Sequence, residues 1–205
     1  MLQKKIRQYL VNAPGRVGGH VALGIVRSAG ELAVHTHDPW YKTDHDPMTG
    51  LILVYRRDVV ASLLSNAITW RSTQSHYYET TQIEPFELSK QEFIDFYRSY
   101  IWHSRSIDFT RLWGRVDVFY FEDFVNNHDH ILTRLGLVQD PTLLEQASIK
   151  HLLFNQAPYS YRDVISNHED LRNFYNTELK NMEFDRNPLR PLELDGSPKT
   201  MEVFK

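Results

Sequence analysis

The chain contains no cysteine, and this absence excludes three kinds of chemistry. Without thiols the protein forms no disulfide framework, builds no zinc site on thiolates and uses no cysteine nucleophile. Its core has to be held together by packing. A cysteine-free composition suits a reducing compartment, so we expect a cytoplasmic protein.

Long hydrophobic runs and an excess of one charge are lacking too. No stretch approaches the ~20 consecutive apolar residues of a membrane-spanning helix, and the first residues do not have the pattern of a secretory signal. The formal net charge is −3 over 205 residues, and no segment carries a stripe of lysine and arginine. We therefore expect no membrane span and no nucleic-acid partner, while the oligomeric state stays open.

Short apolar segments that alternate with helical periodicity predict the fold class. The expected strands span residues 6–11, 32–35, 50–55 and 116–121. A helix is expected after the first strand, at 21–26, and another after the third, at 59–70, where Asp58 is a candidate cap. Strands joined through helices imply right-handed crossovers, so we predict an α/β fold with a mainly parallel central sheet flanked by helices.

A single domain over 1–205 is expected, with a helical insertion at about 71–113 and an extended tail at about 185–205. Ser89 and Glu92 have the spacing of a capping box, and aromatic residues repeat at helical intervals over 93–101. Aromatic side chains of the insertion could line a substrate cleft, but their helical spacing favours a core. Further helices are expected over 140–153 and 167–182, with Asp140 and Asn167 as candidate caps and Ala147 among the buried positions. In the helix at 59–70, Trp70 is expected to share one face with Val59, Leu63 and Ala67.

A glycine-rich turn from Gly15 to His20 follows the first strand and leads into a helix. Glycines let a backbone approach an anion closely, and the start of a helix favours negative charge, so the turn predicts a phosphate ligand. The turn could also serve only to reverse the chain. It is not the phosphate loop of nucleotide hydrolases, because His20 stands where that loop has its lysine.

Arginines stand at the carboxyl end of the third strand. Arg56 and Arg57 follow that strand, and Ser62 lies one turn into the next helix. Ligands of open parallel sheets bind beyond the carboxyl ends of the strands, and a guanidinium matches a phosphate group. The alternative is a structural cluster in which Arg57 pairs with Asp58.

Residues 35–39, His-Thr-His-Asp-Pro, end the second strand. A neutral histidine takes a proton from a hydroxyl near physiological pH, so this segment offers a general base. The alternative is a structural role, which most histidines have. A metal site at His35, His37 and Asp38 is a further alternative, which ranks lower because no other ligand is evident.

Together these stretches resemble the sulfotransferases that use 3′-phosphoadenosine 5′-phosphosulfate (PAPS). In that family, a loop of proline, a basic residue, serine, glycine and two threonines cradles the 5′-phosphosulfate. Its place is taken here by Arg16, Val17, Gly18, Gly19 and His20, with the hydroxyl residues replaced. The family's segment with the general base is similar to residues 35–39, and His37 matches that base.

The resemblance continues toward the carboxyl terminus. The family's 3′-phosphate motif is similar to residues 56–62, with about two residues missing between the arginines, so Arg56 and Ser62 match the phosphate ligands. Residues 119–124 and 132–137 look like the segments that follow in the family. The likeness covers about residues 5–137 in order, which is more specific than any single motif.

The resemblance implies a P-loop-like architecture and a transferase. The sulfuryl group of PAPS would pass to a hydroxyl or amine of a small-molecule or glycan acceptor, leaving 3′-phosphoadenosine 5′-phosphate. His37 would be the base, Arg16 would stabilise charge on the bridging phosphate oxygen, and no metal is implied. The family's carboxyl-terminal segment that closes over the cofactor is not visible, and Lys180, Arg186 and Arg190 are candidates for its charge.

Two alternatives stay open. A nucleotide or small-molecule kinase would use a similar loop, but this loop lacks the lysine and hydroxyl that serve ATP and magnesium. A non-catalytic nucleotide-binding relative would keep the fold and have no need of a base, so His37 discriminates between these functions.

Overall fold

The chain folds into two compact units. The computed structural model describes residues 8–15, 17–37, 50–71, 83–105, 116–154 and 160–182. The first unit comprises Met1–Arg57 and Ser106–Gln156, and the second comprises Asp58–Arg105 and Ala157–Lys205. The expected tail lies outside the described residues. The expectation of a single domain with a helical insertion stays a prediction.

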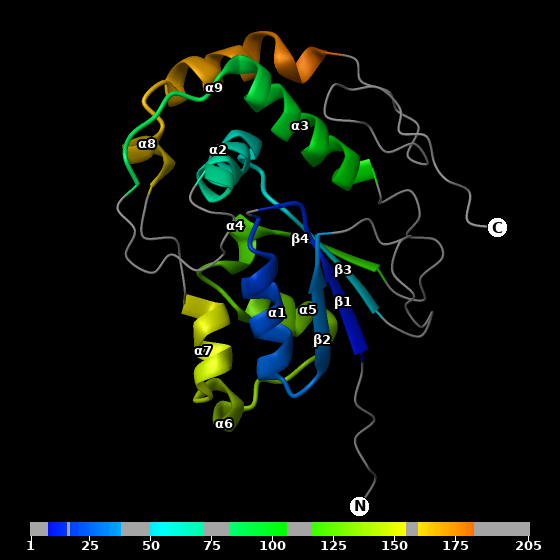
Figure 1. Ribbon diagram of the computed structural model, residues 1–205. Coiled ribbons are helices and arrows are strands. Elements are labelled where there is room, and N and C mark those ends of the chain that lie inside the picture. The colour runs from blue at the N-terminus through cyan, green and yellow to red at the C-terminus, as the bar shows by residue number, and fades with distance from the viewer. Residues whose placement is uncertain are drawn as a thin grey trace, which may run out of the picture. The chain divides into compact units, whose positions relative to one another are not determined.

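The first unit is built on a sheet of four parallel strands in the order β2-β1-β3-β4 (Figure 1). These strands are β1 (Gln8–Asn12), β2 (Leu32–Thr36), β3 (Gly50–Tyr55) and β4 (Val116–Tyr120). Each expected strand segment overlaps one of these strands, although the segment expected over 116–121 ends at Tyr120 because Phe121 begins α4. Their parallel pairing confirms the predicted α/β fold with helices flanking the sheet.

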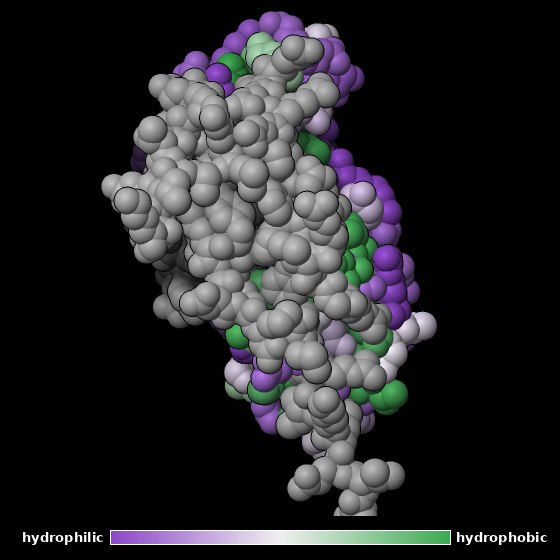
Figure 2. Space-filling model, turned by 90° about the vertical axis from the view of Figure 1, so that its right-hand side faces the viewer, coloured by the Kyte–Doolittle hydropathy of each residue, from purple (hydrophilic) through white to green (hydrophobic). Residues whose placement is uncertain are grey.

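Burial along the strands follows their place in the sheet. The interior strand β3 has five consecutive buried residues, Leu51–Tyr55, as expected for a strand covered on both faces. The outer strand β2 alternates instead, with Leu32 57% and Val34 58% exposed on either side of the buried Ala33. Hydrophobic as well as hydrophilic residues reach the surface in the described parts seen in Figure 2.

The first unit contains five helices among its described residues. They are α1 (Gly19–Ser28), α4 (Phe121–Phe124), α5 (Asp129–Leu135), α6 (Pro141–Leu144) and α7 (Ala147–Phe154). Helix α1 packs on β1 and β2 and contacts α5, α6 and α7. Gly24 is the point of close approach to α7, because a Cβ at this position would lie 2.9 Å from the Cβ of Leu152.

The single helix expected over 140–153 is wrong, since the chain forms α6 and α7 in its place. Asp140 caps α6 by accepting a hydrogen bond from the N–H of Thr142 at 2.8 Å. The carbonyl of Gln146 then accepts from the N–H groups of Ile149 and Lys150 at 3.0 Å, and this starts a new helix. The expected buried position Ala147 is exposed as a result.

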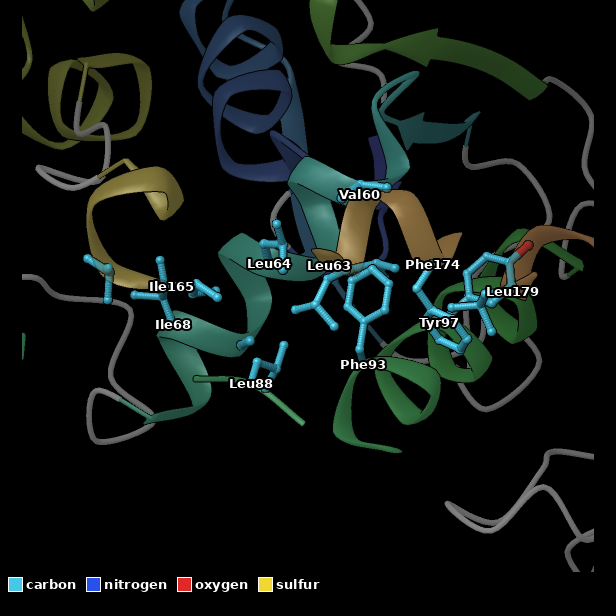
Figure 3. Close-up of a cluster of buried hydrophobic side chains, with 13 residues drawn as sticks. Val60, Leu63, Leu64, Ile68, Leu88, Phe93, Tyr97, Ile165, Phe174 and Leu179 are labelled. Carbon is cyan, nitrogen blue, oxygen red and sulfur yellow. The ribbon is translucent and has the colours of Figure 1, made fainter. Parts of the chain in front are cut away.

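The second unit is helical around its own apolar core. Its elements are α2 (Val59–Arg71), α3 (Lys90–Arg105), α8 (Tyr161–Val164), α9 (His168–Thr177) and a short 3₁₀ helix, η3 (Leu179–Asn181). Figure 3 shows the core, to which α2 contributes Leu63 and Leu64 and α3 contributes Phe93 and Tyr97. The core role favoured for these aromatic residues is confirmed. Trp70 is 65% exposed, contrary to the expectation that it shares the buried face of α2.

Helix starts in the second unit show which predicted caps form. Glu92 accepts the N–H of Ser89 at 3.0 Å, and the Ser89 hydroxyl accepts the N–H of Glu92 at 3.2 Å, which is the predicted capping box. Hydrogen bonds from Ser89, followed by Arg71, hold the pKa of Glu92 below its ordinary value. Asp58 caps α2 by accepting the N–H of Ala61 at 3.0 Å.

Asn167 precedes α9 but does not cap it with its side chain. Its amide oxygen accepts the N–H of Leu88 at 3.1 Å, and its amide nitrogen donates to the carbonyl of Leu88 at 2.9 Å. The predicted cap is therefore wrong, because a distant peptide unit uses both polar atoms of this side chain.

Replacing Phe93 with alanine is expected to lower the free energy of unfolding by about 3–5 kcal/mol, because its ring is fully buried and its removal leaves a cavity. Trp70→Ala is the matched aromatic control and should change it by less than about 0.5 kcal/mol, since Trp70 is exposed. Urea unfolding followed by circular dichroism measures both. Equal losses in the two variants would contradict the described core.

Candidate functional site

The carboxyl ends of the four parallel strands carry the residues singled out by the sequence. The glycine turn follows β1, His37 follows β2, Arg56 follows β3 and Phe121 follows β4. Parallel strands bring their carboxyl ends to one edge of a sheet, which is the edge where ligands bind in open α/β folds. The candidate site is therefore this edge of the first unit.

The glycine turn begins α1 in a way that an anion can use. Gly18 is the N-cap residue with φ 88°, and α1 has neither a side-chain cap nor an acidic residue in its first turn. Such a helix start leaves N–H groups available to a negatively charged ligand. Val17 is fully buried, so its side chain does not face a dissolved ligand. Arg16 lies outside the described residues.

Side chains of the protein fill the space at both glycines of the turn. A Cβ at Gly18 would overlap the ring of Phe121, and a Cβ at Gly19 would overlap the imidazole of His35. The positive φ of Gly18 is a second reason for glycine at that position. Packing within the protein thus explains the two glycines without any ligand.

Three imidazole rings lie together at the start of α1. The ring of His35 is 4.6 Å from that of His20 and 4.4 Å from that of His37, measured between centroids. The contact of His35 with Gly19 places this group beside the glycine turn. His20 is exposed, and His35 and His37 are partly buried. The sequence predicted His37 next to the turn but did not predict the three rings in contact.

A hydrogen bond to the backbone orients the ring of His37. Its Nδ1 lies 2.8 Å from the carbonyl oxygen of Ala13. A carbonyl oxygen only accepts, so Nδ1 carries the hydrogen, and in the neutral ring the lone pair is on Nε2. His37 is therefore prepared to accept a proton at Nε2.

The metal alternative gains no support. In the part of the chain that the structure describes, no group of three or more histidine, cysteine or acidic residues could hold a metal ion. Asp38, the third ligand considered, lies outside that part. The rings of His35 and His37 are nearly perpendicular, with 86° between their planes, so the edge of one ring meets the face of the other.

Arg57 forms a forked ion pair with the end of β4. Its two terminal nitrogens donate to the carboxylate of Asp123 at 2.5 and 2.7 Å, and its guanidinium lies 4.6 Å from the ring centre of Tyr120. This hydrogen bonding raises the pKa of Arg57 and lowers the pKa of Asp123. The alternative pairing with Asp58 is wrong, since Asp58 binds Arg172 at 3.1 Å.

Arg56 lies between a carboxylate and an aromatic ring. Its Nε is 3.7 Å from Oε1 of Glu122, and its guanidinium carbon is 5.1 Å from the ring centre of Phe121. The same Phe121 ring packs against Gly18, so one side chain touches the glycine turn and the candidate phosphate ligand. No role was assigned to Phe121 and Glu122 from the sequence, although their position after the last strand was a usable signal.

Ser62 belongs to the second unit and is buried, with 1% of its surface exposed. Its assignment as a phosphate ligand stays a prediction. Among the candidates for the missing carboxyl-terminal charge, Lys180 lies in η3 of the same unit. Arg186 and Arg190 lie outside the described residues.

The fold and the site together define an α/β protein with a glycine turn, a histidine and an arginine pair at one edge of a parallel sheet. No protein-family model matches the chain, and no curated protein matches it either. Among the described residues, no helix has the length and apolar character needed to cross a membrane.

Gly18→Ala is expected to destabilise the protein more than Gly136→Ala, by at least about 1 kcal/mol. Both glycines have positive φ, 88° and 65°, but only Gly18 faces a ring, whereas a Cβ at Gly136 would meet open space. Gly136→Ala thus reports the backbone strain alone, about 1–2 kcal/mol. Thermal unfolding measures the difference, and equal effects would show that Phe121 does not constrain the turn.

Arg57→Gln is expected to raise the pKa of Asp123 toward its ordinary value of 3.8, because the hydrogen bonds that favour the carboxylate are lost. In the wild type, the lowered pKa favours the folded state above about pH 3.8, and this contribution disappears as the pH falls through the folded-state pKa. Carboxyl NMR titration measures it, with Arg162→Gln as the arginine control. An unshifted Asp123 in Arg57→Gln would contradict the pair.

Proposed function

We propose that this protein is a sulfotransferase that uses PAPS as donor and a hydroxyl or amine of a small molecule or glycan as acceptor. The observation that carries the proposal is the hydrogen bond from His37 Nδ1 to Ala13, beside the start of α1. This hydrogen bond fixes the tautomer of the base, and the base lies beside a helix start that has no side-chain cap. A base and an anion-binding turn are the two parts that this reaction requires.

The described residues fit a phosphosulfate donor at the edge of the sheet. The N–H groups at the start of α1 would hold the 5′ end, and Arg56 would hold the 3′-phosphate, since a guanidinium and a helix start both favour phosphate oxygens. Arg16 matches the family's basic residue and is assigned by that match alone. His20, which replaces a hydroxyl residue, offers a ring nitrogen at the same turn.

The donor supplies the sulfuryl group, whose S–O bond to the phosphate breaks as the acceptor oxygen bonds to sulfur. His37 takes the acceptor proton at Nε2, and 3′-phosphoadenosine 5′-phosphate leaves. The carbonyl of Ala13 keeps Nδ1 protonated during this step, so the ring can carry positive charge without turning. The N–H groups of the turn stabilise the charge that develops on the leaving phosphate oxygen.

The proposal includes a P-loop-like architecture, because a glycine turn joins the interior strand β1 to α1. The loop does not favour the kinase alternative, since His20 occupies the place of the lysine that would bind the phosphates of ATP. The cytoplasmic location expected from the composition also stays a prediction.

His37→Ala is expected to lower the rate of sulfuryl transfer by about 10²–10⁴-fold, which is the usual contribution of a general base. The affinity for 3′-phosphoadenosine 5′-phosphate should change little, because His37 acts on the acceptor. Single-turnover kinetics with labelled PAPS and a panel of acceptors measures the rate, with His151→Ala on α7 as the histidine control. A His37→Ala enzyme of normal rate would contradict the assigned base.

The binding of 3′-phosphoadenosine 5′-phosphate is the direct test of the donor site, and we expect it to raise the melting temperature. Arg56→Gln should weaken this binding by at least about tenfold, since hydrogen bonds to a charged group are worth about 1.5–3 kcal/mol. ATP with magnesium is the comparison ligand. Stabilisation by ATP alone would favour a kinase, and stabilisation by neither ligand would contradict nucleotide binding.

A further inference from the structure

Glu122 has the position of an anion bound at the end of β3. Both of its carboxylate oxygens accept the N–H of Arg57 at 3.1 Å, and Oε1 lies 3.7 Å from Nε of Arg56. A backbone N–H and a guanidinium that converge on one carboxylate form a cradle for negative charge. The cradle lies where the proposed function places a phosphate.

Glu122 contacts the side chain of Arg56 at a longer distance than Asp123 contacts that of Arg57. Asp123 holds Arg57 through two short hydrogen bonds in a fork. The 3.7 Å between Glu122 and Nε of Arg56 is an electrostatic attraction without a short hydrogen bond between these two atoms. The side chains of Arg56 and Glu122 are 26% and 33% exposed, so part of each is open to solvent, while Nε of Arg56 itself is buried.

Loss of the Glu122 contact would leave Arg56 in place. The ring of Phe121 supports the guanidinium at 5.1 Å, and that ring is itself fixed against Gly18. Arg57 is held separately by Asp123 and Tyr120. If the carboxylate moves away, the side chains of both arginines keep these contacts, and the N–H of Arg57 loses the acceptor that an incoming anion could replace.

We infer that Glu122 is an internal anion that occupies the site at Arg56 and is displaced when a phosphate group of the ligand binds. The identity of the ligand rests on the proposed function, whereas the displacement does not. Arg56 and Glu122 together are neutral, so an incoming anion must compete with a charge already in place. Glu122 thus lowers the affinity of the site for a phosphate group.

Glu122→Gln is expected to bind 3′-phosphoadenosine 5′-phosphate about tenfold more tightly than the wild type, because the competing charge is gone. Glutamine keeps an oxygen that accepts the N–H of Arg57. The gain should vanish when Arg56→Gln is added. Isothermal titration calorimetry measures the three variants, with Glu145→Gln, a glutamate paired with Lys150, as the charge-matched control.

Inorganic pyrophosphate is the second probe, and it separates this inference from the proposed function. Tighter pyrophosphate binding by Glu122→Gln, with no binding of the nucleotide by any variant, would support the internal anion and overturn the sulfotransferase. Nucleotide binding that is unchanged or weaker in Glu122→Gln would overturn the internal anion alone. If Glu122→Gln does not fold, Glu122→Asp moves the carboxylate back by one methylene group and should show a smaller gain of the same sign.

Discussion

Parallel pairing of β1 with β2 on one side and with β3 on the other decides where the chemistry of this chain gathers. Asn12 at the end of β1 is aligned with Thr36 and with Leu53, so the segments that follow all three strands leave the sheet at one edge. An antiparallel partner would send its following residues to the opposite end. The turn, the histidine and the arginines are brought together by strand direction before any side chain is considered.

The strands were predictable because each is a short apolar run, and its length favours a strand over a buried helix. Helices were less predictable where hydrogen bonds outweigh periodicity. The apolar spacing over 140–153 continues through Gln146, yet the carbonyl of that residue starts a second helix. Trp70 shows a related limit of periodicity. Helical spacing assigns Trp70 to the apolar face of α2, but it does not show where along the helix the core ends.

The candidate site was predictable in its residues and not in its partners. The sequence placed Arg57 at a strand end, but its partner Asp123 is 66 residues away. The register that aligns Tyr55 with Tyr120 decides this pairing, and register is a property of the folded sheet. The contact of Phe121 with Gly18 depends on the same register. Charges near one another in the chain, such as Arg57 and Asp58, mislead when folding offers each a better partner.

The side chain of Asn167 acts as a substitute peptide unit. It offers Leu88 one donor and one acceptor, the same pair that a neighbouring strand would offer. Leu88 is itself 1% exposed within the apolar core, and the nearby Phe86 forms a bridge with Ile165. Because one side-chain amide makes both hydrogen bonds, we expect the segment before α3 and the start of α9 to open together. Exchange of the Leu88 amide hydrogen with solvent should then follow the opening of the start of α9.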